Sequence, residues 1–246
     1  MSIAWVFPGQ GSQKLGMAEN VMRLEGAAKR FELASNILGR DLLDICKTIN
    51  QHKNEDSDLN DTRNTQPAMF VVESLLVDEL FRQGRKPSFL AGHSLGEFVA
   101  LYAAKVFDAE RALRLLKIRS ELMAEVVGGS MTAVIGFKRN ELESLIAANE
   151  AVVIANDNSQ SQVVLSGSVE AVAEVSDKLI CKRAIPLKVS GAFHSPFMEV
   201  PAEKFSKQLD QVNFYNAIIP VISNAEPSPA VDADLLKKRL KVQMIS

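Results

Sequence analysis

Two short apolar runs in the first part of the chain predict buried strands. Residues 3–7 end at Pro8-Gly9, so this strand is expected to enter a tight loop. Residues 88–91 form the second run and lead into a glycine-containing segment. Apolar side chains at helical spacing predict helices at residues 25–38, after Thr65, up to Ala104, and from Asp108 to about residue 127.

The helix after Thr65 has boundary signals of its own. Thr65 is expected to cap it, Pro67 to lie in its first turn, and Gly84 to end it. Residues 50–64 are almost wholly polar, which predicts an exposed loop before this helix.

The pattern changes after Gly128-Gly129. Strands and helices are expected in the order β-α-β-β-α-β, the order of a small ferredoxin-like unit. The predicted elements are strands at residues 131–137, 152–155, 163–166 and 184–189, and helices at residues 141–148 and 169–180. A strand at residues 220–223 and a helix from Asp232 are expected to return to the larger domain. We therefore predict a large domain of residues 1–128 and 189–246 and a subdomain of residues 129–188.

Composition narrows the class of protein. The 246 residues are 47% hydrophobic and 24% charged with a net charge of -2, which is typical of a soluble globular protein without bulk attraction to nucleic acid. The start has no secretory pattern and no stretch is long enough to span a membrane. Cys46 and Cys181 lie in helix-like segments without metal or redox spacing, so we expect buried free thiols and a cytoplasmic protein.

Gly92-His93-Ser94-Leu95-Gly96 matches the G-x-S-x-G pattern of a nucleophilic serine. A serine at a sharp strand-to-helix turn needs small neighbours, and the turn pushes its hydroxyl out of the sheet. The following helix aims backbone N–H groups at the point where an oxyanion would form. The alternative is an ordinary turn whose small residues allow close packing.

The loop after the first predicted strand, Gly9-Gln10-Gly11-Ser12-Gln13, is a second glycine-bracketed turn. Its backbone N–H groups are candidates for the second donor of an oxyanion hole. It lacks the lysine of a phosphate-binding P-loop and the third glycine of a dinucleotide fingerprint, and a plain turn is the alternative.

A serine hydroxyl needs a neighbouring base, and the chain offers three histidines. His52 lies in the polar loop, and the side chain of His93 is expected to point away from the line of attack. His194, in a loop of small residues, is the best candidate, the alternative being a structural loop histidine. The group that orients it is left open between a backbone carbonyl and one of the acids Asp157, Asp232 and Asp234.

Arg119 lies on the second helix after the serine turn. An arginine on a helix is most often a surface residue, and the functional alternative is a bidentate clamp on a substrate carboxylate. The position of Arg119 in the sequence does not distinguish a surface residue from a carboxylate clamp.

Several motifs now occur in order: GQGSQ near the start, GHSLGE around Ser94, RSELM around Arg119, Asn158 before QVV, and GAFHS around His194. Together they resemble the malonyl-CoA:acyl carrier protein transacylases of type II fatty acid synthesis, over nearly the whole chain. The resemblance implies an α/β fold, in which a large α/β hydrolase-like domain carries an inserted ferredoxin-like α+β subdomain.

The resemblance also implies a role for each site residue. Ser94 would carry the malonyl ester, and His194 would act as base and then as acid. Backbone N–H groups of Gln10 and Leu95 would form the oxyanion hole. The other implied roles are a malonyl carboxylate partner for Arg119, substrate contacts for His93, Phe193 and Asn158, and a backbone carbonyl of Gln243 that holds His194.

The implied reaction is ping-pong malonyl transfer from coenzyme A to the phosphopantetheine thiol of acyl carrier protein, by a monomer without metal or other cofactor. A serine acyl hydrolase is one alternative. A catalytically impaired carrier-binding remnant is another, because the family usually continues several tens of residues past the position of Gln243. The basic run Lys237, Lys238, Arg239 and Lys241 would meet an acidic carrier or form a solvated helix face.

Overall fold

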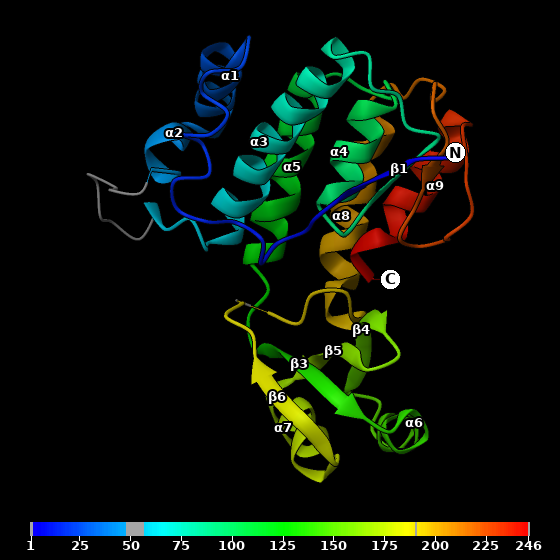
Figure 1. Ribbon diagram of the computed structural model, residues 1–246. Helices are drawn as coiled ribbons and strands as arrows, with labels where there is room; N and C mark the ends of the chain where they lie inside the picture. The colour runs from blue at the N-terminus through cyan, green and yellow to red at the C-terminus, as the bar shows by residue number, and fades with distance from the viewer. Residues whose placement is uncertain (1, 48–56, 190, 246) are drawn as a thin grey trace. The chain divides into compact units, whose positions relative to one another are not determined.

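The computed structural model describes residues 2–47, 57–189 and 191–245 (Figure 1). The chain divides into two compact units. The first comprises Met1–Glu121 with Phe205–Lys241, and the second comprises Leu122–Lys204 with Val242–Ser246.

A three-stranded parallel sheet organises the first unit. Its order is β1 (Ala4–Phe7), β2 (Phe89–Gly92) and β7 (Val221–Ile222), with β2 in the centre. The three predicted strands are confirmed to within one or two residues. Phe7 pairs with Gly92, so the carboxyl ends of β1 and β2 are level, and the loops that follow them leave the same edge of the sheet.

Helices bury this sheet. All eight residues of α4 (Gly96–Ala103) are buried, and α4 packs against β1, β2 and α3 (Thr62–Arg82). Figure 1 shows α3 and α4 in a row with α5 (Ala109–Ala124). Two further helices, α1 (Ala27–Leu38) and α2 (Leu42–Ile45), pack against α3, and α9 (Ala233–Val242) follows β7. Helices α2 and α8 (Glu199–Asp210) were not predicted from the sequence.

The predicted start of α3 was wrong. The N-cap is Asp61, whose side chain accepts from the Arg63 N–H, so Pro67 lies inside the helix rather than in its first turn. A proline cannot donate to the carbonyl four residues earlier, which here belongs to Arg63. That carbonyl accepts from the Arg40 guanidinium at 2.9 Å, so a distant side chain supplies the hydrogen bond that the proline cannot make.

The loop predicted at residues 50–64 is wrong at its end, because α3 begins at Thr62. Residues 62–64 belong to α3, and residues 50–56 lie outside the described part of the chain.

A four-stranded antiparallel sheet organises the second unit, in the order β4-β5-β3-β6. Helix α7 packs against β3 and β5, and α6 packs against α7, around a core that includes Val134, Leu142 and Leu165. The elements are β3 (Gly129–Phe137), α6 (Arg139–Ala147), β4 (Val152–Ser159), β5 (Gln162–Ser168), α7 (Val169–Lys178) and β6 (Cys181–Pro186).

The predicted position of Cys181 was wrong. It begins strand β6 and is only half-buried, whereas a helix-like, buried position was expected. Helix α7 ends at Lys178, and from Cys181 the chain pairs with β3. Cys46 is buried at the end of α2, where loss of hydration raises the pKa of its thiol to about 12.

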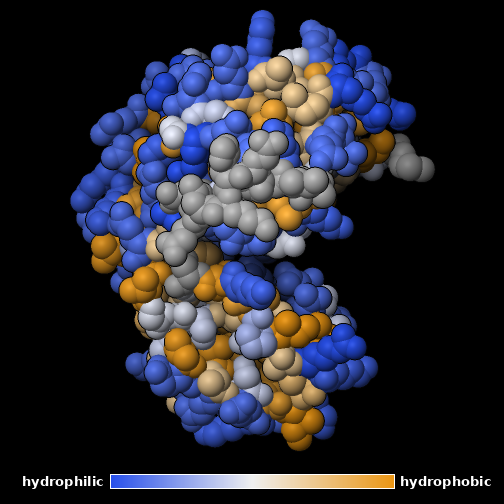
Figure 2. Space-filling model, turned by 90° about the vertical axis from the view of Figure 1, so that its left-hand side faces the viewer, coloured by the Kyte–Doolittle hydropathy of each residue, from blue (hydrophilic) through white to orange (hydrophobic). Residues whose placement is uncertain are grey.

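The surface carries hydrophobic as well as hydrophilic side chains. Both kinds appear on the face drawn in Figure 2, and exposed apolar residues include Val6 in the first unit and Ile180 in the second. Among the described residues, no helix is long and apolar enough to cross a membrane.

Candidate functional site

The turn between β2 and α4 holds Ser94 in a left-handed backbone conformation, with φ at 52°. The two flanking glycines explain how the turn closes. A Cβ on Gly92 would lie 2.0 Å from the Gly96 carbonyl, and a Cβ on Gly96 would lie 2.4 Å from the Phe7 carbonyl oxygen. The G-x-S-x-G spacing therefore creates the sharp bend that the sequence predicted.

The loop after β1 packs directly on this turn. The His93 N–H donates to the Phe7 carbonyl at 2.9 Å, and a Cβ on Gly9 would lie 2.6 Å from the His93 carbonyl oxygen. His93 is partly exposed, and the desolvation of its packed side lowers the pKa of the imidazole. A neutral His93 at neutral pH follows.

A chain of hydrogen-bonded side chains runs from the first loop to Ser94. The Thr62 hydroxyl donates to Gln10 Oε1 at 2.8 Å and accepts from Gln66 Nε2 at 2.8 Å. Arg119 Nη1 donates to Gln66 Oε1 at 2.6 Å, and Arg119 Nη2 donates to Ser94 Oγ at 3.0 Å. The structure thus brings Gln10, Ser94 and Arg119 together, three residues that the sequence analysis had named separately.

Arg119 is buried, whereas an arginine on a helix is most often a surface residue. It is 1% exposed, and its guanidinium lies 5.7 Å from the centroid of the Phe98 ring. Desolvation lowers the pKa of Arg119 to about 10, and the nearby Glu97 carboxylate opposes that shift. The side chain is therefore still cationic at neutral pH.

Backbone donors at the start of α4 differ in their availability. The N–H groups of Gly96 and Glu97 donate to the carbonyls of His93 and Ser94. Within the described part of the chain the Leu95 N–H donates no hydrogen bond, so it is available to an external acceptor.

Asn224 contacts the serine turn and was missed by the sequence analysis. Its Oδ1 accepts from the Ser94 N–H at 2.7 Å, and its Nδ2 donates to the Gly92 carbonyl at 2.6 Å and to Glu97 Oε2 at 2.8 Å. Asn224 follows closely after β7. Polar residues at the carboxyl ends of neighbouring parallel strands meet at one edge, and that rule could have found it.

In the second unit, Gln243 supports His194. The Gln243 carbonyl oxygen lies 3.0 Å from His194 Nδ1, and both residues are buried. A carbonyl can only accept, so Nδ1 carries the proton and Nε2 carries the basic lone pair.

The loop that carries His194 is packed tightly. His194 has φ at 55°, a second non-glycine residue in the left-handed region. A Cβ on Gly191 would lie 2.6 Å from the Val126 carbonyl oxygen, and one on Gly129 would lie 2.6 Å from Ala192 Cβ. Phe193 is buried in the same loop.

Two of the three acids considered as partners of the histidine have other roles. Asp157 binds Arg139 through both carboxylate oxygens, and Asp232 accepts from the Leu235 N–H at the start of α9. Asn158, predicted to touch substrate, is exposed near the end of β4, where the pairing with β5 is irregular. Within the described residues, no side-chain hydrogen bond joins it to another predicted site residue, so its role stays a prediction.

The basic run on α9 is largely engaged within the protein. Lys237 donates to the Val212 carbonyl, Arg239 binds Ser228 and Glu226, and Lys241 pairs with Asp210. Among the residues described, no group of three or more histidine, cysteine or acidic side chains is placed to hold a metal ion.

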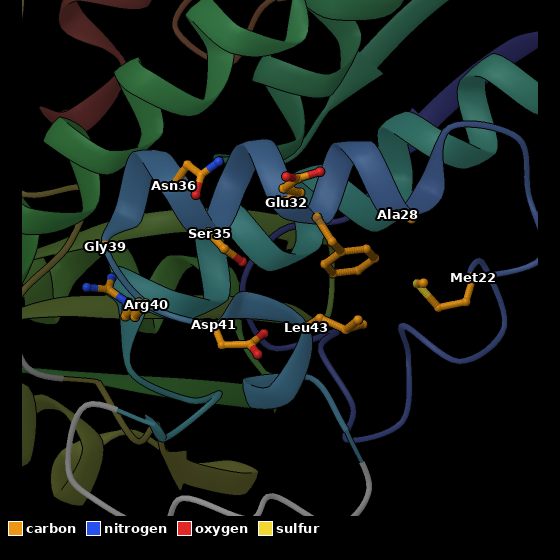
Figure 3. Close-up of a pocket in the computed structure, with 10 residues that line it drawn as sticks. Met22, Ala28, Glu32, Ser35, Asn36, Gly39, Arg40, Asp41 and Leu43 are labelled. Atoms are coloured by element: carbon orange, nitrogen blue, oxygen red, sulfur yellow. The ribbon is translucent and has the colours of Figure 1, made fainter.

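A pocket of about 600 Å³ lies apart from these groups. Figure 3 shows side chains of α1, including Glu32 and Asn36, facing it together with Arg40 and Asp41. The ten side chains drawn there do not include Ser94 or Arg119.

Comparison with known proteins identifies the relatives of this chain. Residues 4–243 match the acyl transferase domain family. The chain is 44% identical to a malonyl CoA-acyl carrier protein transacylase of Synechocystis over 99% of this chain and 81% of that protein.

Solved structures agree. The crystal structure of the Synechocystis malonyl-CoA:ACP transacylase matches with a TM-score of 0.94 at 45% identity, over 100% of this chain and 82% of that one. A malonyl-transacylase solved in complex with its type II polyketide acyl-carrier protein matches with a TM-score of 0.89 at 33% identity, over 99% of this chain and 81% of that one.

Proposed function

The chain belongs to the acyl transferase domain family, and we propose that it moves a malonyl group from coenzyme A to the phosphopantetheine thiol of an acyl carrier protein in fatty acid biosynthesis. The observation that carries this proposal is the buried Arg119 guanidinium 3.0 Å from Ser94 Oγ. A cation held beside the nucleophile selects an acyl group that ends in a carboxylate, as malonyl does. The names of the relatives support the same substrate and partner.

In the proposed mechanism, Ser94 Oγ attacks the thioester carbonyl while its proton moves to His194 Nε2. The tetrahedral intermediate collapses, the carbon–sulfur bond breaks, and His194 returns the proton to the coenzyme A sulfur. The second half repeats these steps in reverse order with the carrier thiol. The hydrogen bond from His194 Nδ1 to the Gln243 carbonyl supports this role, because it orients the ring and stabilises the transient imidazolium.

The oxyanion that forms in each half-reaction is assigned to two backbone donors, the N–H groups of Leu95 and Gln10. Support comes from the first loop, which packs on the serine turn, and from the hydrogen bond that holds the Gln10 side chain to Thr62. Removing one such donor typically lowers kcat by about 100- to 1,000-fold.

The remaining site residues are assigned to the acyl pocket. We assign His93 and Phe193 to its walls and Asn158 to an outer substrate contact. A neutral His93 suits this place because it adds no second cation beside Arg119.

The finer architecture belongs to the same proposal. Residues 1–128 and 189–246 would form an α/β hydrolase-like domain, and residues 129–188 would be a ferredoxin-like subdomain inserted into it. In support, the elements β3 to β6 follow the order β-α-β-β-α-β, and their sheet is antiparallel throughout.

Intact-mass measurement after incubation with malonyl-CoA or acetyl-CoA tests the function. We expect a stable malonyl adduct, no acetyl adduct, and no adduct in S94A. Release of coenzyme A without an adduct would support a serine hydrolase instead, and neither release nor adduct from a folded sample would contradict both activities.

A further inference from the structure

One amide side chain bridges the serine turn. Asn224 accepts from the Ser94 N–H at 2.7 Å and donates to the Gly92 carbonyl at 2.6 Å, so it binds backbone groups on both sides of His93. The left-handed conformation of Ser94 is strained and persists only where surrounding contacts hold it. Asn224 supplies two such contacts, although the residue itself is largely exposed.

Glu97 provides a second acceptor for this amide and also binds the Asn224 backbone. Its Oε2 accepts from Asn224 Nδ2 at 2.8 Å and from the Asn224 backbone N–H at 3.1 Å. A backbone N–H only donates and a carbonyl only accepts, so Oδ1 faces Ser94 and Nδ2 faces Gly92, and Glu97 Oε2 accepts from the same Nδ2. Glu97 is 1% exposed, and its charge also acts on Arg119.

We propose that Asn224 is a positioning residue for Ser94 and that Glu97 anchors it through two hydrogen bonds. This inference rests on the proposed function in taking Ser94 as the nucleophile. Because Asn224 occupies the Ser94 N–H, the Leu95 N–H is left as the donor of this turn toward an oxyanion. Loss of Asn224 therefore moves the nucleophile and its donor together, and no group that touches substrate is removed.

Three variants separate this role from a general loss of structure. N224A removes the bridge, and N224D keeps an acceptor for the Ser94 N–H but places a second carboxylate against Glu97. In N224D/E97Q the amide introduced at position 97 donates to the carboxylate introduced at position 224. N216A is the matched control, since Asn216 Oδ1 also accepts a backbone N–H, that of Ala233 at 3.0 Å, at the start of α9.

Two rates are measured for each variant: labelling of Ser94 by a fluorophosphonate, and malonyl transfer. A misplaced nucleophile costs about 100-fold in rate per ångström, so we expect N224A to lose about 10- to 100-fold in labelling rate and in kcat with little change in KM for malonyl-CoA. We expect N224D to be slower still, N224D/E97Q to recover part of that loss, and N216A to match the unaltered protein.

Labelling of N224A at the unaltered rate overturns the proposal, and a double variant no faster than N224D overturns the part assigned to Glu97. If N224A does not fold, the comparison of N224D with N224D/E97Q, made on samples of equal melting temperature, still decides. Failure of the unaltered protein to accept malonyl while the fluorophosphonate labels Ser94 would contradict the proposed substrate and leave this test intact.

Discussion

The two residues to which we assign the chemistry have strained backbone conformations. Ser94 and His194 both have positive φ, as does Lys105 after the end of α4. Ser94 and His194 are each held by packed glycines and by a hydrogen bond donated to a distant residue. Such strain is kept where a side chain must be presented in one direction. The proposed preference for malonyl also depends on a single residue, because Arg119 places a buried charge beside Ser94.

Replacing Arg119 should therefore change substrate preference. We expect R119A to lower kcat/KM for malonyl-CoA by about 10- to 100-fold, since a hydrogen bond to a charged group contributes roughly 1.5–3 kcal/mol. Transfer from acetyl-CoA should not fall in parallel. R119K, which keeps the charge without the planar fork, should lie between.

Steady-state kinetics with the two thioesters provide the measurement, and fluorophosphonate labelling reports whether Ser94 is still presented. Equal losses with malonyl-CoA and acetyl-CoA would contradict a carboxylate clamp.

At the scale of elements, the strand-to-helix unit β2–α4 presents the nucleophile. The helix is buried along its whole length. A Cβ on Gly96 would collide with the end of β1 and one on Gly92 with the start of α4, so only glycine fits at either position. Helix α3 then carries Thr62 and Gln66 across to Arg119. The geometry around Ser94 is therefore set by side chains on packed helices rather than by adjustable loops.

A methyl group on Gly96 should displace this turn. We expect G96A to destabilise the protein by about 1–3 kcal/mol through overpacking against the Phe7 carbonyl and to abolish labelling of Ser94. Gly39 offers a matched control, because it has φ at 72° at the end of α1 and a Cβ there would meet nothing within 4 Å. G39A should cost about 1 kcal/mol of stability and leave labelling unchanged. Chemical denaturation and labelling rate check both, and normal labelling of G96A would disprove the steric argument.

At the scale of the whole molecule, one buried acid links stability to pH. Glu73 on α3 is 8% exposed, and neither carboxyl oxygen has a hydrogen-bond partner in the described part of the chain. Burial raises the pKa of Glu73 from 4.5 to about 8. The folded protein thus keeps a proton that the unfolded chain releases.

The sign of the effect follows from this difference. Between about pH 4.5 and pH 8 the folded state binds more protons, so the free energy of unfolding falls as the pH rises. We expect E73Q to remove most of this fall and to be more stable than the unaltered protein at pH 8, by on the order of a few kcal/mol. Urea unfolding at several pH values measures it, with E32Q, at an exposed site on α1, as the control. Parallel pH curves for E73Q and the unaltered protein would contradict the prediction.

The sequence by itself determined the local parts of this protein. The serine turn, the strands that flank it and the order of elements after residue 128 follow from glycine spacing and apolar periodicity, which act over a few residues. The helix start at Asp61 was missed for the opposite reason, because the Arg63 carbonyl beneath Pro67 is satisfied by Arg40 from another segment.

Only the tertiary structure decided how the chemistry is assembled. Spacing alone left Arg119 undecided between surface and site, the family resemblance implied the site, and the fold places it against Ser94, 25 residues away in sequence. The Gln243 carbonyl reaches His194 across 49 residues, and Asn224 reaches Ser94 across 130. No local pattern encodes such contacts, because they depend on which strands become neighbours in the sheet and which helices pack on it.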